Sequence, residues 1–301
     1  MTGLYSLTVR NIKLYFKDKG LFFSSLITPM ILLVLYATFL KNVYEDSFRS
    51  SLERAGVQIS DAVINGCVGG ELVSSLLAVS CVTVAFCCNL MMIKDKTSGA
   101  RHDLTITPAK PRVLALGYFL ATLSSTLIIS FAAMAVSLLY LAAVGWYMSF
   151  ADVMLTVLDV LLLTMFGTAL SSCTNFFLTT DGQASAVGTI VSSGYGFICG
   201  AYMPISTFST GLQRVLSFLP GTYGTGLIRR HALRGVFAEM GNLGFPEEVL
   251  DSIRDSLDCN LYFFDHRVTE GAMYLVLGGS ILLLIAVFVA MNILTEKKKG
   301  A

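Results

Sequence analysis

Long apolar stretches recur along the whole chain. A transmembrane helix needs about 20 mostly apolar residues, because the hydrocarbon layer is roughly 30 Å thick and an α-helix rises 1.5 Å per residue. Gly145-Trp146-Tyr147-Met148 predicts a tight hairpin between two such stretches, with aromatic side chains at the membrane interface. The pattern predicts an all-α membrane protein with six transmembrane helices that forms a single domain over residues 1–301. The predicted spans are residues 21–40, 66–93, 113–144, 151–178, 184–205 and 272–294.

Composition supports a lipid environment. Charged residues make up 14% of the chain and hydrophobic residues 54%, whereas soluble domains contain roughly 25% charged residues. The formal net charge of +1 gives no electrostatic case for nucleic acid as a partner. The seven cysteines have no CxxC spacing, so we expect small core residues. For Cys259, pairing with Cys67 or Cys199 is an alternative to the free thiol that we expect.

The distribution of basic residues predicts the orientation. With six crossings, residues 1–20, residues 94–112 and the C-terminal tail share one side and carry 12 Lys and Arg residues, whereas the other side carries nine, spread over long loops. Basic residues close to span ends favour the cytoplasmic side. We therefore expect a multi-pass protein of the cell membrane with both termini in the cytoplasm.

Three segments outside the spans have patterns of their own. Leu4 to Lys17 places apolar residues on one helical arc and basic residues on the opposite arc, which predicts an interfacial helix within residues 1–20. Residues 204–237 contain two short apolar runs around Pro220-Gly221 and predict a re-entrant hairpin in the outer leaflet. In residues 238–271, Pro246 followed by two glutamates predicts the start of a small exposed helical cap.

No pattern for catalysis is present in the sequence. Neither the phosphate-binding loop GxxxxGK[ST] nor the HExxH and GxSxG motifs occurs, and His102, His231 and His266 are isolated. We expect no catalytic, cofactor or metal residue in this chain. Two acidic residues, Glu71 and Asp159, lie in apolar runs. Glu71 is expected to reach the outer headgroups. Asp159 belongs either to a polar or proton-linked substrate path or to hydrogen-bonded packing, which we favour.

The segment Lys94–Pro108 is the sizeable loop on the predicted cytoplasmic side, and it joins two long helices. Gly99 is suited to end the extension of the second span, and the residues up to Thr107-Pro108 predict one short helix. A short helix held at the ends of two spans can act as a lever that tilts both. The same residues also fit an ordinary loop whose Lys and Arg only fix the topology.

Four motifs in order resemble the permease subunits of type-2 ABC exporters. Arg10-Asn11…Tyr15-Phe16-Lys17-Asp18 resembles the amphipathic connecting helix of that family, and Lys94–Pro108 resembles its coupling helix, although Asp95 stands where the family usually has Glu. Residues Met203-Pro204 and 216–223 resemble its hairpin after the fifth span, which Leu233-Arg234-Gly235 closes. The stretch 238–271 is longer than is usual in the family.

The resemblance implies an ATP-driven exporter of an amphipathic or lipid-like substrate, such as a drug, an antibiotic, a peptide or a lipid-linked glycan. ATP and Mg²⁺ would bind a separate ATPase subunit, and the permease would form a dimer with a copy or a related chain in contact with membrane lipid. The implied ATPase-coupling residues, with Asp95 and Arg101 as candidates for ion pairs to the ATPase, are Arg10, Lys17, Asp18, Asp95, Lys96, Gly99, Arg101, Leu104, Thr107 and Pro108.

Further residues are candidates for substrate contact and for the hairpin. A possible substrate path comprises Phe86, Met91, Met92, Tyr195, Phe197 and Asp159, although such residues at helical spacing more often serve packing. The hairpin residues are Pro204, Leu219, Pro220 and Tyr223. Two alternatives to the exporter stay open: an ATP-independent secondary transporter or channel, which Asp159 supports, and a membrane sensor or assembly protein whose cap at 238–271 recognises a ligand.

Overall fold

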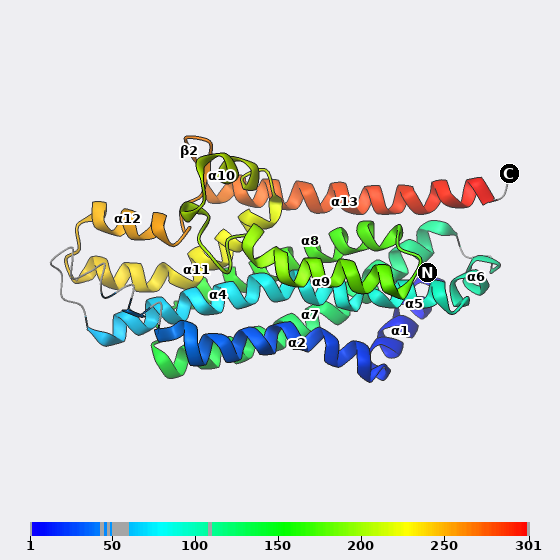
Figure 1. Cartoon of the computed structure of the whole chain (residues 1–301), viewed down its shortest axis with the longest axis horizontal. Coiled ribbons are helices and arrows are strands. Elements are labelled where there is room, and N and C mark those ends of the chain that lie inside the picture. The colour runs from blue at the N-terminus through cyan, green and yellow to red at the C-terminus, as the bar shows by residue number, and fades with distance from the viewer. Residues whose placement is uncertain (1, 43–44, 47–48, 50–59, 108–109, 300–301) are drawn as a thin grey trace.

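The protein is an elongated bundle of helices in the computed structural model, which describes residues 2–42, 45–46, 49, 60–107 and 110–299. In Figure 1 the long helices run side by side along the long axis, both chain ends lie near one end of the bundle, and α12 lies near the other. This arrangement agrees with the predicted all-α membrane class.

The elements of the first half are α1 (Thr2–Lys17), α2 (Lys19–Leu35), a π-helical turn η1 (Tyr36–Leu40), α4 (Asp61–Cys88), α5 (Leu90–Thr97), α6 (Ala100–Thr105) and α7 (Pro111–Val144). Those of the second half are α8 (Phe150–Phe176), α9 (Asp181–Ile198), η2 (Ile205–Thr207), α10 (Thr210–Leu216), α11 (Pro220–Asn242), α12 (Glu247–Ser256), β1 (Tyr262–Phe263), β2 (His266–Arg267) and α13 (Glu270–Lys299). The two strands form a short antiparallel hairpin, which the sequence analysis did not predict.

Four helical segments of the described chain are long and apolar enough to cross a membrane: Asp61–Thr97, Pro111–Val144, Phe150–Phe176 and Glu270–Thr295. A fifth is added if α1 and α2, which meet at 75°, count as one bent span. The count of six is therefore not confirmed. The predicted fifth span corresponds to α9, whose glycine, serine and threonine residues lower its hydropathy and which ends at Ile198, just before the chain turns at Gly200 (φ 75°).

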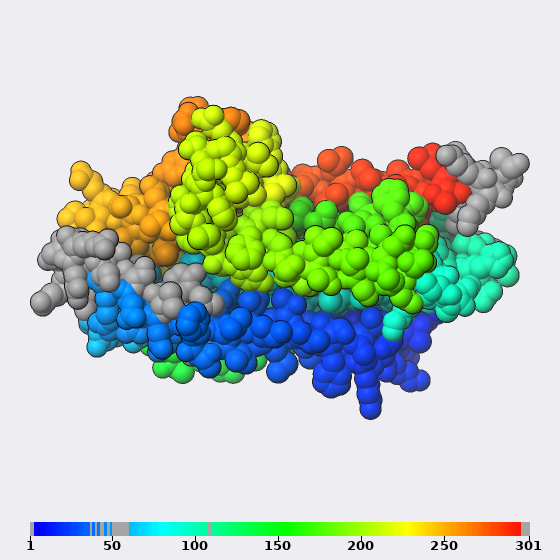
Figure 2. Space-filling view, viewed as in Figure 1, coloured from blue at the N-terminus to red at the C-terminus, as the bar shows by residue number. Residues whose placement is uncertain are grey.

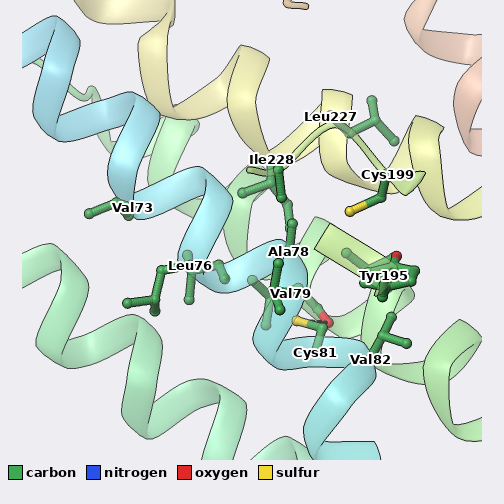
Figure 3. Close-up of a cluster of buried hydrophobic side chains, with 14 of the residues drawn as sticks. Val73, Leu76, Ala78, Val79, Cys81, Val82, Tyr195, Cys199, Leu227 and Ile228 are labelled. Carbon is green, nitrogen blue, oxygen red and sulfur yellow. Dashed lines mark hydrogen bonds between the residues drawn. The ribbon is translucent and has the colours of Figure 1, made fainter. Parts of the chain in front are cut away.

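Helix α4 is the centre of the bundle. It is buried along nearly its whole length and contacts α2, α7, α8, α9 and α11. Val73, Leu76, Val79 and Val82 of α4 belong to one buried apolar cluster with Tyr195 and Cys199 from the end of α9 and Leu227 and Ile228 of α11. Figure 3 shows Val82 beside Tyr195, whereas Val73 and Leu76 point to the other side of α4. Each fully buried Leu, Ile or Val stabilises such a core by about 1.5–3 kcal/mol where water would otherwise reach it. In lipid, close packing supplies the corresponding attraction.

Several predicted breaks are confirmed. The second span extends through α5 to Thr97, and Gly99 then adopts φ 80°, a conformation that suits glycine, before α6 begins. The chain between α7 and α8 turns in the predicted hairpin, and a capping box formed by Ser149 and Asp152 starts α8. Pro246 precedes α12, as expected for the helix of the cap.

The two short apolar runs predicted as a re-entrant hairpin in residues 204–237 correspond to helices of very different length. Helix α10 has 7 residues, whereas α11 has 23 and runs to Asn242. We expected the second arm to close at Gly235. That glycine instead lies against the α7–α8 loop, where an added Cβ would stand 1.8 Å from the carbonyl oxygen of Tyr147. Gly235 thus permits a close approach of two backbones inside a helix that continues. In Figure 2, α10 and the strand hairpin project from the side of the bundle.

Candidate functional site

The α5–α6 turn lies at the end of the bundle that holds both chain termini (Figure 1). Helix α6 exposes half of its residues, including His102 and Asp103, and Ile106 just after it is 72% exposed. Ile106 thus adds an exposed apolar side chain to a turn whose other exposed residues are polar or glycine. The turn therefore presents a short helix to solvent, as the sequence predicted.

Ion pairs join this turn to α1 and to the α1–α2 joint. Arg10 of α1 donates to both carboxylate oxygens of Asp95, at 2.7 and 3.2 Å, and Tyr118 of α7 donates to the same carboxylate at 2.7 Å. Lys94 pairs with Asp18, whose carboxylate also caps the N-terminus of α2 by accepting from the Leu21 amide. The hydrogen bond from Lys94 lowers the pKa of Asp18, because it stabilises the ionised carboxylate.

Two further cations join the turn to α8 and α13. The Lys96 ammonium donates to three carbonyl oxygens at the C-terminus of α8, those of Asn175, Phe176 and Leu178, at 2.7–3.0 Å. A cation is favourable there because the last carbonyls of a helix have no partners within it. Arg101 donates to the side-chain oxygen of Asn292 at 3.1 Å, and its guanidinium lies 6.0 Å from the ring centres of Tyr118 and Phe176.

These contacts correct one sequence-based expectation. Asp95 and Arg101 were candidates for ion pairs to an ATPase, but Asp95 is buried and pairs with Arg10, and Arg101 reaches Asn292 across the bundle. The sequence could not show this, because Arg10 and Asp95 are 85 positions apart. Both residues thus make contacts within the chain, Asp95 as a buried residue and Arg101 as a partly buried one.

The other predicted coupling residues have varied surroundings. Lys17 is exposed at the end of α1. Leu104 packs against the apolar cluster beneath the turn, and the Thr107 hydroxyl donates to the Leu104 carbonyl. Gly99 forms the break described above, and Pro108 lies outside the described residues. Of the coupling residues in this paragraph that the structure describes, Lys17, Gly99 and Thr107 are exposed.

A second group of charges lies inside the bundle, at the opposite end. The Arg229 side chain of α11 is 1% exposed, and its Nη2 stands 2.8 Å from Glu71 of α4 and 2.7 Å from the Gly200 carbonyl, while Nη1 stands 3.6 Å from Asp258. We had expected Glu71 to reach the outer headgroups, but this prediction is wrong, because Glu71 is buried and neutralises the Arg229 guanidinium. Burial raises the pKa of Asp258, and Arg229 opposes that rise.

Asp159 of α8 also lies in a hydrogen-bonded group. Its carboxylate is fully buried, with His231 Nδ1 at 2.5 Å and the Tyr274 hydroxyl donating at 2.6 Å. Both carboxylate oxygens thus have partners, from α11 and α13. This geometry agrees with the packing role that the sequence analysis favoured. The basic partners of the two buried acids, His231 for Asp159 and Arg229 for Glu71, were missed because a basic residue in the sequence does not reveal which helix it faces.

The residues predicted for a substrate path separate into two sets. Met91 and Met92 are buried in packing against α1 and α7, and Phe197 is 52% exposed beside the Tyr202 ring. Phe86 and Tyr195 line an apolar cavity of about 460 Å³. Its other walls come from α8, α11 and α13. Asp159 is not among the residues that line it.

The predicted hairpin residues surround the start of α11. Pro204 precedes η2, Leu219 is the N-terminal capping residue of α11, and Pro220 occupies the first helical turn, where proline costs no hydrogen bond. The buried Tyr223 hydroxyl donates to the Ser217 carbonyl at 2.5 Å and so fixes α10 against α11.

Comparison with known proteins agrees with this geometry. A family model described as ABC-2 family transporter protein matches residues 65–295, which includes the α5–α6 turn, both buried charge groups and α13. Comparison with curated proteins gives no matching relative. Because the family model covers well over half of the 301 residues, the chain belongs to the ABC-2 family of transporter proteins and is a multi-pass membrane protein.

Proposed function

We propose that this chain is the membrane-spanning subunit of an ATP-driven exporter, powered by a separate ATPase that docks on the α5–α6 turn. ATP and Mg²⁺ bind that ATPase, and a second permease, either a copy or a relative of this chain, completes the transporter. Membership of the ABC-2 family supports a transporter subunit that works with an ABC ATPase. Export, the dimer and the docking surface are the parts of the proposal that experiments must establish.

One observation carries the proposal: four cations and their partners fix the α5–α6 turn to four other helices. Arg10 and Lys94 connect it to α1 and the start of α2, Lys96 to the end of α8, and Arg101 to α13. A turn connected in this way does not yield by itself when a partner pushes on α6. The displacement passes to the helices, which is what an ATPase needs in order to change the permease conformation.

The same proposal includes the topology. With six crossings, α2 is the first span and α9 the fifth, both termini lie in the cytoplasm, and α10 with α11 enters the outer leaflet from outside. The polar composition of α9 is compatible with a span that packs against another permease, because small residues let helices approach closely in a membrane. The α12 region then stands outside the cell.

The cavity of about 460 Å³ beside Phe86 and Tyr195 supports an amphipathic or lipid-like substrate. Its walls are almost entirely apolar and come from α4, α8, α9, α11 and α13. A cavity with such walls at membrane depth accepts an acyl chain or a flat apolar ring system. Replacement of Phe86 by Trp is expected to fill part of this space and reduce transport, without loss of ATP hydrolysis.

Reconstitution tests the function directly. The chain, purified together with its ATPase and placed in liposomes, is expected to stimulate ATP hydrolysis and to move a fluorescent amphipathic substrate only when ATP is present. Ile106→Glu, on the exposed face of the turn, is expected to reduce binding of the ATPase. Leu243→Glu, at an exposed apolar position at the other end of the bundle, is the matched control for the added charge and should leave binding of the ATPase unchanged.

The rival function, an ATP-independent transporter that uses Asp159 for proton transfer, makes a different prediction. Asp159→Asn would then abolish transport, which would proceed with no nucleotide and depend on a pH gradient. Under our proposal Asp159→Asn weakens packing, and transport still requires ATP. Transport at full rate without nucleotide or ATPase would rule out the exporter.

A further inference from the structure

Four arginines converge on one pocket at the end of the bundle opposite the α5–α6 turn. The pocket has a volume of about 390 Å³. Its lining combines residues that are far apart in the sequence: Arg230 and Arg234 of α11, Arg254 of α12, Arg267 of β2 and Glu270 of α13. Four guanidinium groups and one carboxylate give this lining a formal charge of +4 − 1, or +3.

The neighbouring contacts fix the arginines in place without neutralising the pocket wall. Arg230 Nε and Arg234 Nη2 share a single oxygen of Glu270, at 2.8 and 3.0 Å. The Arg254 guanidinium lies 5.3 Å from the centre of the Phe237 ring, and Arg267 donates to Asn260 at 2.6 Å. Such contacts reduce the rotamer entropy that a ligand would otherwise have to remove on binding.

Acidic partners outside the lining complete this arrangement. Arg254 contacts Glu247 at 2.5 Å and Asp251 at 2.9 Å, and Arg234 stands 3.5 Å from Asp152. None of these three carboxylates lines the pocket. Arg267 also stands 3.9 Å from Asp251. Together with Glu270, these carboxylates formally balance the four arginines, but of the four carboxylates only Glu270 lines the pocket, so four guanidinium groups and one carboxylate face a ligand there.

Hydrogen-bond donors remain for a ligand. A guanidinium carries five N–H groups in a planar fork. The two carboxylate partners of Arg254 both contact Nη1, and the contact of Arg230 with Glu270 is made by Nε. Each of these arginines therefore keeps further N–H groups, and Arg234 and Arg267 are each more than two-fifths exposed.

We propose that this pocket binds the phosphate group of a small polar headgroup. Arginine forks match a tetrahedral phosphate with paired hydrogen bonds, and several such forks from different elements give a bond to each oxygen. The volume exceeds that of a bare phosphate and lies in the range of small-ligand pockets, so a glycerol or sugar moiety fits beside the anion. The phosphate belongs either to a soluble phosphate monoester or to a phospholipid headgroup.

The site does not depend on transport, so binding can be measured without an ATPase. Detergent-solubilised full-length protein is titrated with glycerol phosphate by isothermal calorimetry, with inorganic phosphate as the second probe. The expected result is saturable binding of glycerol phosphate. Arg267→Gln is expected to raise the dissociation constant about tenfold or more, as loss of charge-assisted hydrogen bonds does. Arg267→Lys keeps the positive charge but not the planar fork of N–H groups, so its dissociation constant is expected to lie between those of the wild type and Arg267→Gln.

Arg214→Gln is the matched control. Arg214 lies at the same end of the bundle, against the Phe264 ring, and does not line this pocket. The Arg214→Gln substitution removes the same charge and should leave the affinity for glycerol phosphate unchanged. Thermal unfolding of each variant reports whether the variant is folded. A separate arm uses nanodiscs with phosphatidylglycerol or with neutral, phosphate-free lipid: occupancy by the phospholipid weakens apparent binding of glycerol phosphate, whereas a site for soluble ligands binds equally in both.

Three results would each overturn the proposal. They are the absence of saturable glycerol phosphate binding both in detergent and in nanodiscs of phosphate-free lipid, unchanged affinity in Arg267→Gln, and an equal loss in the Arg214→Gln control. Failure of the exporter assay above leaves this binding result untouched, so the two proposals fail separately.

Discussion

Replacing Asp95 by Asn isolates the connection between the α5–α6 turn and α1. The wild-type carboxylate accepts two bonds from Arg10 and one from Tyr118. Asn keeps the shape but removes the charge and one acceptor oxygen. Arg10 then loses its ion pair, while Lys94 still holds Asp18 and Lys96 still holds the end of α8. The change therefore weakens one connection of the turn and preserves the others.

The expected cost follows from these contacts. Hydrogen bonds to a charged group contribute about 1.5–3 kcal/mol each. The Asp95 side chain is 6% exposed but that of Arg10 is 33% exposed, so solvent screens part of the pair and the lower end applies. The remaining oxygen of Asn can still accept one bond, so loss of two of the three contacts is expected to lower the free energy of unfolding by about 3 kcal/mol. If about half of this free energy connects α6 to α1, coupling falls roughly tenfold.

The assay compares ATP hydrolysis with substrate transport in the same liposomes. Asp95→Asn should leave hydrolysis within about twofold and reduce transport per ATP roughly tenfold. The Arg10→Gln variant should give the same loss, and the double variant should add little, because both changes remove one interaction. Asp265→Asn, an exposed carboxylate at the other end of the bundle, is the control. Full coupling in Asp95→Asn, or additive losses in the double variant, would refute the proposed transmission.

Two further predictions concern stability. Gly235→Ala places a Cβ 1.8 Å from the Tyr147 carbonyl oxygen, so it should destabilise the protein by more than the roughly 1–3 kcal/mol of ordinary overpacking and lower the unfolding temperature. The control is Gly278→Ala, where nothing lies within 4 Å of the added Cβ and the change should be neutral or slightly stabilising. Equal effects of the two variants on the unfolding temperature would contradict the prediction. The ion pair of Asp18 with Lys94 should stabilise the α1–α2 joint fully at pH values above the ordinary Asp pKa of about 3.9. This stabilisation should be lost as the pH falls through the lowered pKa of Asp18 in the folded protein. The stability of Asp18→Asn, measured by unfolding at a series of acid pH values, should therefore lack this decrease.

Local sequence patterns were sufficient to predict the class of the protein and most of its helix breaks. Hydropathy and the low charge content predicted a helical membrane protein, Gly99 predicted the turn before α6, and Pro246 predicted the start of α12. These features depend on residues within one or two helical turns of each other, so their pattern is visible in a short window. The family resemblance was also carried by such short motifs, and the family match confirms it.

Which charged residues meet depends on the three-dimensional packing of the helices. Arg10 lies 85 positions from Asp95, Arg101 lies 191 from Asn292, and His231 lies 72 from Asp159. The length of α11 likewise depended on Gly235 meeting a distant loop. The rotation and tilt of each packed helix fix these partners, and no local pattern records them. The arginine pocket arises for the same reason, because its walls come from four elements that the fold alone brings together.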